Sequence, residues 1–579
     1  MNSVPLVLTL LVALTLPQQG RDTRPTPAGT GRIAGTVVDA ESGRPIRFAH
    51  VLLRSPQEER LVVTDGGGAF SFDRLPSGAY RLVIAKPGYL ETAYGQLRPG
   101  TDTPGKQIVL RDREPVARVV VPLSQGGAIS GTVRDDRGDP VYGAEVSVSR
   151  WVTAYGVRHL EGVEHARTDE RGNYRVSLLP PRDYVLSAAP PGFGVPETES
   201  SPSPFEFATA FHPGVSSAAD AESIRLGLGE TRSNIDLTLP LVAVGGVSGV
   251  VLDANGKPAA GVEVALLSPG EVTTGEAGRS TVTGADGRFL YEKVVPGAYV
   301  LTASTIPQND RIRFSYSHAR IVQGSGVYSP ERMMTTEVRA DREPASPTTT
   351  HPPASAWSDV SVTGGGTSNV TLSLEPPRKL MGRLVLEGAA RPPALKEIRI
   401  EMSALRGPHG SGVNINEDGT FEVENLAPGR YAINVGGFAA PWSLSSVSVG
   451  GVEALDAFLE MPRDRDVRDV TVTLRDREAE LSGSVSDAAG RPVTERTVVV
   501  FPSDDRLWAG FMRVQAEFLS ADGLFVFKHL RPGRYLLAVV DGIEAGEWLD
   551  PAFLRNLLPA AVPVSIGEGE RKVQDLRVR

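Results

Sequence analysis

Short runs in which apolar and polar residues alternate, separated by turn residues, follow one another along most of the chain. One arrangement recurs five times, with an aromatic residue ten positions before a tyrosine. The five pairs are Phe70 and Tyr80, Tyr174 and Tyr184, Phe289 and Tyr299, Phe421 and Tyr431, and Phe525 and Tyr535. Apolar residues at every second position predict strands with one buried face. The recurrence therefore predicts five copies of one β-rich unit.

Each copy is predicted to be a β-hairpin followed by a second turn. Residues 64–80 read TDGGGAFSFDRLPSGAY, and residues 520–535 read SADGLFVFKHLRPGRY. Asp or Asn with Gly supplies the positive-φ positions of a tight turn. The L-x-P-G step is another turn, because Pro fixes φ and Gly relieves strain. The tyrosine then opens a further strand.

Two more signatures frame the copies. A strand and a loop of the form G-x-V-x-D-x-x-G-x-P begin at Gly35, Gly131, Gly249 and Gly483, with a degenerate version at Gly382. An alternating strand closes each copy at Leu123, Leu241, Leu374, Leu474 and Val578. Several short strands with frequent turns, over about 100 residues, are typical of an antiparallel β-sandwich.

The predicted fold class is all-β, with five tandem antiparallel β-sandwich domains of transthyretin-like or immunoglobulin-like type. The predicted domains span residues 30–124, 127–242, 245–376, 378–476 and 479–579. Because the joints are only a few residues long, we expect a semi-rigid, elongated rod. Two excursions, 190–220 and 340–358, are expected to be surface loops or disordered insertions. A short helix is expected near Pro551–Leu558, where Pro suits the first turn.

The N-terminus carries an apolar run, Val4–Leu16. A membrane-spanning helix needs about 20 apolar residues, so this run fits a signal peptide over residues 1–20 better than a membrane span. No other segment is long and apolar enough to cross a membrane. We therefore expect export to the periplasm, the cell surface or the extracellular space. An uncleaved anchor and a misassigned start are the alternatives.

The three signatures together resemble the carboxypeptidase regulatory-like domain over nearly the whole mature chain. The motifs that carry the resemblance are the G-x-V-x-D-x-x-G-x-P start, the D-G-x-F hairpin and the L-x-P-G-x-Y strand. Secreted bacterial proteins can carry several copies of this module. The resemblance implies a transthyretin-like sandwich, also called a carbohydrate-binding-like fold, with an accessory, surface or carbohydrate-contacting role.

Composition narrows the function further. The net charge is −9, and the 60 basic and 69 acidic residues are mixed without a basic block. Binding to a phosphate backbone needs clustered Lys or Arg, so nucleic acid is not an expected partner. The absence of cysteine excludes disulfides, thiolate nucleophiles and Cys-based zinc sites.

The sequence also lacks the common catalytic motifs H-E-x-x-H and G-x-S-x-G and a phosphate-binding loop. His159 and His165, with Glu161 and Glu164, come nearest to a set of zinc ligands, and the alternative is a solvated segment between strands. We predict a non-enzymatic protein without cofactor or metal. A metal-dependent hydrolase that uses these four residues is the alternative.

Two further sets of residues have the types found in metal sites or covalent cross-links. The hairpin acids are Asp65, Asp169, Asp286, Asp418 and Asp522. Calcium needs six to eight oxygen ligands and each turn offers fewer, so a turn role is expected. Collagen-binding B-type domains, a related sandwich family, can form Lys–Asp isopeptide bonds. Lys379 and Asp469 are the pair in this chain that such a bond would use.

The five tryptophans lie outside the repeated pattern, at Trp151, Trp357, Trp442, Trp508 and Trp548. An exposed aromatic face can stack on a sugar ring, whereas a buried one fills a core. Two binding hypotheses stay open. In one, the chain is a spacer or adhesin that contacts other surface proteins. In the other, Trp508, Phe511 and Trp548 bind polysaccharide.

Overall fold

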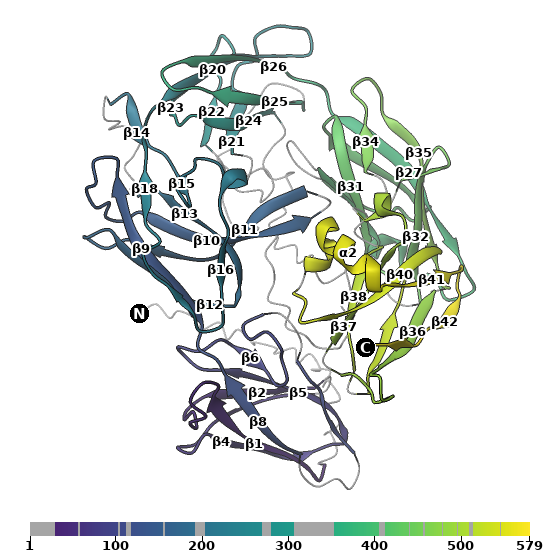
Figure 1. The fold of residues 1–579 in the computed structure, drawn as a ribbon. Helices are drawn as coiled ribbons and strands as arrows, with labels where there is room; N and C mark the ends of the chain where they lie inside the picture. The colour runs from purple at the N-terminus through teal and green to yellow at the C-terminus, as the bar shows by residue number, and fades with distance from the viewer. Residues whose placement is uncertain are drawn as a thin grey trace, which may run out of the picture.

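The computed structural model describes the chain from residue 29 to residue 578, with internal gaps. The gaps are 56–57, 102–104, 112–116, 155–156, 192–202, 269–278, 306–352, 405–410, 439–440, 455–457, 478, 495, 509–512, 521 and 545. Strands dominate the described residues, which confirms the all-β fold class (Figure 1). The expected signal peptide lies outside the described residues. No helix in the described part is long and apolar enough to cross a membrane.

The first sandwich consists of two sheets with the strand orders β4-β1-β8 and β3-β2-β5-β6, and β7 also pairs with β5. Its strands are β1 (Gly31–Asp39), β2 (His50–Arg54), β3 (Glu59–Val63), β4 (Ala69–Leu75), β5 (Gly78–Ala85), β6 (Thr92–Ala93), β7 (Ile108–Leu110) and β8 (Ala117–Leu123). The opening strand β1 is antiparallel to β4 but parallel to the closing strand β8. The sandwich is therefore antiparallel except for this pair.

The second sandwich repeats this plan, with sheets β12-β9-β17 and β11-β10-β13-β15. Its main strands are β9 (Gly127–Asp135), β10 (Glu145–Ala154), β11 (Val157–Arg167), β12 (Asn173–Leu179), β13 (Arg182–Ala189), β16 (Ile224–Leu226), β17 (Thr231–Arg232) and β18 (Leu237–Leu239). Part of the excursion 190–220 is not a plain loop, because it contains two short strands. The strand β14 (Phe205–Phe207) pairs with β19 (Leu241–Ala243), and β15 (Ala210–Phe211) pairs with β13. Single-sequence patterns do not reveal such two- and three-residue strands.

The third sandwich has sheets β23-β20-β26 and β22-β21-β24-β25. Its strands are β20 (Gly245–Leu252), β21 (Glu263–Leu267), β22 (Arg279–Val282), β23 (Arg288–Val294), β24 (Gly297–Ser304), β25 (Ser355–Val362) and β26 (Thr367–Ser373). The end of the excursion 340–358 belongs to β25, and the part before residue 353 lies outside the described residues.

The fourth and fifth sandwiches keep the two-sheet plan, with added elements. The fourth contains β27 (Arg378–Glu387), β28 (Arg399–Ala404), β29 (Ser411–Asn414), β30 (Thr420–Leu426), β31 (Gly429–Gly436), β32 (Ser443–Val449), β33 (Val452–Glu453), β34 (Leu459–Met461) and β35 (Val467–Arg475). The fifth contains β36 (Glu480–Ser486), β37 (Arg496–Pro502), β38 (Gln515–Phe518), β39 (Leu524–Phe527), β40 (Gly533–Asp541), β41 (Val562–Ile566), β42 (Arg571–Val573) and β43 (Leu576–Arg577). The helix α2 (Pro551–Leu557) confirms the predicted short helix, with Pro in its first turn.

Each sandwich has its own hydrophobic core, and the fifth has a second, smaller cluster around its short helix. Nine of the ten spaced aromatic residues are buried, and Tyr299 is half-buried. Each tyrosine hydroxyl donates to the carbonyl oxygen four residues upstream. The O···O distances are 2.8 Å for Tyr80, 2.7 Å for Tyr184, 2.9 Å for Tyr299, 2.9 Å for Tyr431 and 2.8 Å for Tyr535. This tyrosine corner fixes the turn before the strand.

The hairpin turns also follow the prediction. The turn glycines Gly68, Gly172, Gly287, Gly419 and Gly523 all have positive φ, between 71° and 81°. In the first three sandwiches a buried threonine braces the loop that faces this turn. Thr64, for example, accepts from the amide of Ala49 and donates to the carbonyl of Ile46, both at 2.8 Å. Thr168 and Thr283 do the same.

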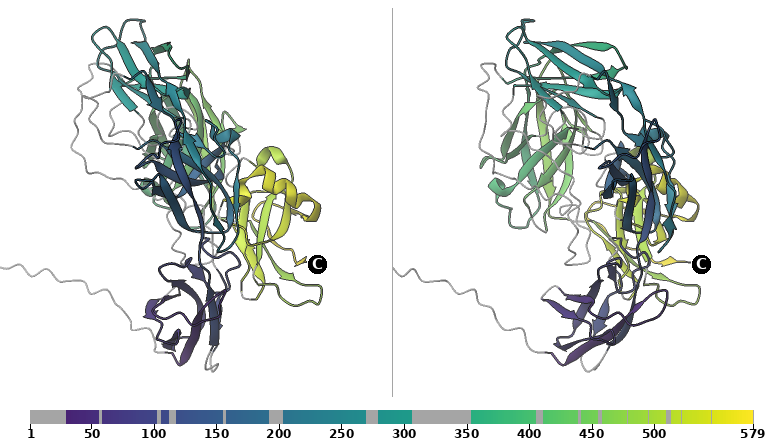
Figure 2. Two further views of the ribbon diagram at one scale, coloured as in Figure 1. Left: turned by 60° about the vertical axis from the view of Figure 1, so that its left-hand side comes forward. Right: turned by 90° about the vertical axis from the view of Figure 1, so that its left-hand side faces the viewer.

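The expectation of an elongated rod is wrong, because the chain turns back on itself (Figures 1 and 2). The fifth sandwich lies beside the first and the second, and Arg150 and Glu544, 394 positions apart, form an ion pair. Short joints restrict the angle between neighbouring sandwiches. The angle that accumulates over the three joints from the second sandwich to the fifth, and the side chains that meet as a result, cannot be predicted from the joints. The predicted boundaries between separately folding domains stay a prediction.

Candidate functional site

The residues predicted for ligand contact lie inside a core. Trp508 and Trp548 are 3% and 5% exposed, and both belong to the smaller cluster of the fifth sandwich. The Trp508 indole donates to the carbonyl of Pro502 at 2.7 Å and meets Phe501 edge to face, with ring centroids 5.8 Å apart. Phe511 lies outside the described residues. A buried indole cannot stack on a sugar, so these positions support the packing interpretation.

The other tryptophans differ in environment. Trp442 is buried and donates to the carbonyl of Arg391 at 2.9 Å. Trp151 and Trp357 are half-buried, and the Arg158 guanidinium carbon lies 4.3 Å from the centre of the Trp151 ring. The cation therefore covers one face of this ring.

The four candidate zinc ligands do not converge. His159 and His165 lie six residues apart on the extended strand β11, which separates them by about 20 Å at roughly 3.3 Å per residue. The Glu161 carboxylate binds Arg150 at 2.5 Å. Among the residues that the structure describes, no group of three His, Asp or Glu side chains could hold a metal ion. The hydrolase alternative therefore has no assembled site here.

Two of the hairpin acids, Asp65 and Asp169, bind the backbone of their own turns. The Asp65 carboxylate accepts from the amides of Gly67 and Ala69 at 2.9 and 2.8 Å. Asp169 accepts from two amides in the same way, and its hydrogen bonds with Asn173 lower the pKa of its carboxyl. These oxygens are occupied by backbone donors, as a turn role requires.

The isopeptide candidate Lys379 is engaged by carboxylates other than that of Asp469. The Lys379 side chain is largely solvent-accessible, and its Nζ binds Glu422 and Glu424, the latter at 2.6 Å. Asp469 is also exposed and occupies a positive-φ position with φ 58°. The ammonium of Lys379 is thus paired with two other carboxylates across β30.

The arrangement that sequence reasoning missed is the interface of the fifth sandwich with the first two, here called the seam. At its centre the Glu544 carboxylate binds Arg150 at 2.9 Å and Arg182 at 3.0 Å. The Glu544 side chain is 9% exposed, and the two arginine side chains are nearly as buried. Glu544 follows β40 of the fifth sandwich, whereas Arg150 and Arg182 come from β10 and β13 of the second.

The seam extends to the first sandwich. Arg98 reaches Glu547 at 3.5 Å, and the Glu547 carboxylate also accepts from the Glu544 amide at 3.0 Å. A β-carbon at Gly542 would lie 3.2 Å from Nε of Arg98, so backbone and guanidinium pack closely. In the same interface, the positive charge of Arg81 in the first sandwich lowers the pKa of the buried Glu517 of β38.

Burial dominates the electrostatics of the seam. It raises the pKa of Glu544, and the nearby Arg182 and Arg150 oppose the shift. Burial also raises the pKa of Glu517 to about 8, opposed by Arg81. Buried ion pairs add little net stability against apolar packing, but removal of one partner leaves an uncompensated charge. Replacement of Glu544 by a neutral residue would therefore leave the nearly buried Arg182 without this partner.

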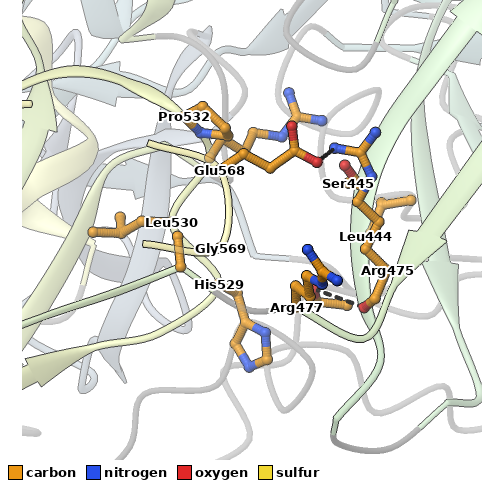
Figure 3. A pocket seen from close by; sticks show the side chains of 12 residues that line it. Leu444, Ser445, Arg475, Arg477, His529, Leu530, Pro532, Glu568 and Gly569 are labelled. Carbon is orange, nitrogen blue, oxygen red and sulfur yellow. Dashed lines mark hydrogen bonds and ion pairs between the residues drawn. The ribbon is translucent and has the colours of Figure 1, made fainter. Parts of the chain in front are cut away.

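A smaller contact joins the fourth and fifth sandwiches. Arg475 pairs with Glu568 across this joint, and Figure 3 shows the Glu568 carboxylate turned towards the fourth sandwich. Arg531 lies 3.8 Å from Glu453. Arg475, Arg531 and Glu568 line a pocket with a volume of ≈ 30 Å³, enough for one or two water molecules. It is far below the roughly 300 Å³ of typical small-molecule sites.

Three stretches of the chain, 32–111, 128–239 and 246–313, match the model of the carboxypeptidase regulatory-like domain. The first three sandwiches are therefore similar to carboxypeptidase regulatory-like domains in tandem. The matched stretches fall in the three sandwiches that contain the threonine brace. In the fourth and fifth sandwiches the corresponding residues are the buried Ile415 and Leu519. Those two sandwiches therefore share the turns and the tyrosine corner of the first three sandwiches but not the threonine brace.

Several solved structures resemble this chain at low sequence identity. The TIE protein of Bacillus anthracis is 12% identical, with 78% of this chain and 74% of that chain covered and a TM-score of 0.15. A streptococcal ancillary pilin is 11% identical, with 60% and 99% covered and a TM-score of 0.21. Two B repeats of the collagen-binding protein of Staphylococcus aureus are 12% identical, with 77% and 99% covered and a TM-score of 0.14. No curated protein matches the chain significantly.

Proposed function

We propose that this chain is an exported, non-enzymatic structural or interaction protein, a spacer, adhesin or accessory module that meets other surface proteins. The residues that recur in all five sandwiches support this proposal, because each has a structural task. The aromatic pairs fill cores, the tyrosine hydroxyls secure turns, and the glycines allow left-handed backbone. A recurring catalytic group is not among these repeated positions.

The observation that carries the proposal is the seam. Three charged side chains, Glu544, Arg150 and Arg182, are buried where the fifth sandwich meets the second. Groups of this kind contribute more to the choice of one geometry than to net stability. A chain whose buried polar network holds distant sandwiches together is suited to act as a shaped scaffold. The polysaccharide and hydrolase alternatives lack a comparable arrangement, because the candidate indoles are buried and the candidate ligands are far apart.

Small-angle X-ray scattering of the purified protein tests the scaffold. We expect the wild-type profile to match the closed arrangement, in which the fifth sandwich contacts the first two. Glu544→Arg should increase the radius of gyration, because it places three cations together at the seam. Glu460→Arg is the matched control, because it makes the same charge change at an exposed position of β34. A wild-type profile of an extended rod, or equal expansion of both variants, would contradict the proposed scaffold.

Export is tested separately by cell fractionation. We expect the protein in an exported fraction and shortened at its N-terminus. Full-length protein that retains residues 1–20 in the cytoplasm would contradict export while leaving the scaffold result unaffected.

A further inference from the structure

The strand β10 of the second sandwich continues beyond the sheet to which it belongs. Its residues 145–149 pair with β11 on one side and with β13 on the other. Its residues 150–154 pair with β11 alone, opposite residues 157–161, and these two stretches are here called the ribbon. In the other four sandwiches the equivalent strands β2, β21, β28 and β37 pair along their whole length with β5, β24, β31 and β40. Among the described strands, this extension is therefore peculiar to the second sandwich.

The ribbon adds nothing to the core of its own sandwich. Val146 and Val148 from the inner part of β10 belong to that core, and Val163 and Ala166 of β11 pack against it. The described residues of the ribbon are not part of it. A two-stranded hairpin by itself is at best marginally stable in water. The ribbon therefore depends on support from another part of the molecule.

A bulge at the base of the ribbon sets its direction. Val148 lies opposite Glu164, but Ser149 lies opposite Gly162, so Val163 is an extra residue on β11. Such bulges bend a strand pair and redirect it. From this point β10 and β11 run towards the fifth sandwich (Figure 1), where β10 lies beside η7 (Glu547–Leu549).

Arg150, the first residue of the ribbon, is held by carboxylates from two sandwiches. Its Nε lies 2.5 Å from Glu161 on the opposite ribbon strand, and its Nη1 lies 2.9 Å from Glu544 of the fifth sandwich. The side chains of Glu161, Arg150 and Glu544 are 20%, 15% and 9% exposed. Charges at this depth are costly without their partners. Glu161 thus positions the guanidinium of the ribbon for Glu544.

The charges that meet across the seam are segregated by sign. On the first two sandwiches they belong to the arginines Arg81, Arg98, Arg150 and Arg182, and on the fifth to the glutamates Glu517, Glu544 and Glu547. Opposite charges on two facing surfaces favour their association and set its register. The acidic surface of the fifth sandwich therefore fits the basic surface to which the ribbon contributes Arg150.

We infer that the ribbon is a clasp, an extension of the second sandwich that holds the fifth sandwich in the closed arrangement. Arg182, at the start of β13, binds the same Glu544 carboxylate from the body of the second sandwich, so the carboxylate is held from two sides. Because the ribbon lies outside the core, the clasp can release the fifth sandwich without unfolding the second. This inference rests on the proposed scaffold and names the element that closes it.

Small-angle X-ray scattering of a shortened chain tests the clasp. In this variant Asn-Gly replaces residues 150–161, so that a two-residue turn joins Ser149 to Gly162, which already lie opposite each other. We expect the radius of gyration to rise as far as in Glu544→Arg, with a far-UV circular dichroism spectrum that still shows folded sandwiches. A shortened chain that stays closed would overturn the clasp and leave the scaffold intact, whereas an extended wild-type chain would overturn both.

Arg150→Glu keeps the ribbon and tests the clasp even if the shortened chain does not fold. It places a third carboxylate beside Glu161 and Glu544, so we expect the same rise in the radius of gyration. Arg175→Glu is the matched control, because it makes the same charge change at an exposed position of β12, in the other sheet of the second sandwich. Equal radii for these two variants would overturn the clasp.

Hydrogen exchange provides a local measurement that a general loss of stability would not reproduce. In Glu544→Arg the ribbon loses its support, and we expect its amides to exchange about tenfold faster than in the wild type. The amides of Val146 and Val148, which lie between two neighbouring strands, should exchange as before. Ribbon amides that exchange at the wild-type rate in an opened chain would overturn the inference, because the fifth sandwich would then not support the ribbon.

Discussion

Gly35 lies directly opposite Phe70 on the neighbouring strand, and a β-carbon at Gly35 would lie only 2.7 Å from Cζ of that ring. The same pairing recurs at Gly249 with Phe289, Gly382 with Phe421 and Gly483 with Phe525. In each pair the ring lies across the glycine and covers the backbone of the first strand. In these four repeats the opening glycine is therefore required by the aromatic ring and by a still closer backbone carbonyl on its other side.

Gly483→Ala is expected to destabilise the fifth sandwich. Its β-carbon would lie 2.8 Å from Cζ of Phe525 and closer still to the carbonyl of Gln574. Overpacking of this kind costs about 1–3 kcal/mol. Calorimetric unfolding measures the loss, with Gly436→Ala as control because nothing lies within 4 Å of its added carbon. Equal melting temperatures for Gly483→Ala and the wild type would contradict the packing argument.

Phe525→Ala should cost more than Gly483→Ala. The ring is 1% exposed in the core of the fifth sandwich, and truncation of a buried Phe costs about 3–5 kcal/mol. Leu524→Ala, at the exposed neighbouring position on β39, should change little. Denaturant unfolding compares the two variants, and similar losses would show that the ring does not contribute through burial.

Leu178→Asn is expected to stabilise the second sandwich. Leu178 has φ 60° and an exposed side chain, so it bears left-handed strain without burial in return. Asn tolerates this conformation, and relief of the strain should add about 1 kcal/mol to the free energy of unfolding. Asn425→Leu, the reverse change at the corresponding position with φ 61°, should destabilise the fourth sandwich. Thermal unfolding distinguishes these opposite signs.

Closure of the seam should weaken in alkali. Burial raises the pKa of Glu517 from 4.5 to about 8 in the closed arrangement, and Arg81 opposes this shift. If opening exposes this carboxyl to water, the closed form holds the proton more tightly than the open form. Its contribution to closure is complete below pH 4.5 and is lost as the pH rises through about 8.

Scattering at pH 6 and pH 9.5 measures this effect as an increase in the radius of gyration. Glu517→Gln should reduce the increase, because the amide does not titrate. Glu544, whose pKa is shifted in the same direction, accounts for any part that remains. An unchanged radius for the wild type across this range would show that Glu517 does not couple to closure.

The sequence by itself determined the repeated sandwich, because its signals are local. The ten-residue spacing from Phe525 to Tyr535 spans one hairpin arm and one turn, and alternation sets which faces are buried. The positive φ at Gly523 and the helix beginning at Pro551 follow from the same short-range chemistry. These features depend on neighbours within a few residues, and the pattern records them directly.

Only the tertiary structure decided where the tryptophans point and how the sandwiches meet. The burial of Trp508 depends on Phe501 and on the helix that follows β40, which a motif outside the repeat does not reveal. The ion pair of Arg150 with Glu544 joins residues 394 positions apart. This ion pair forms only if the rotations between successive sandwiches add up so that these two side chains come within 3 Å. The local pattern of residues does not specify the total rotation.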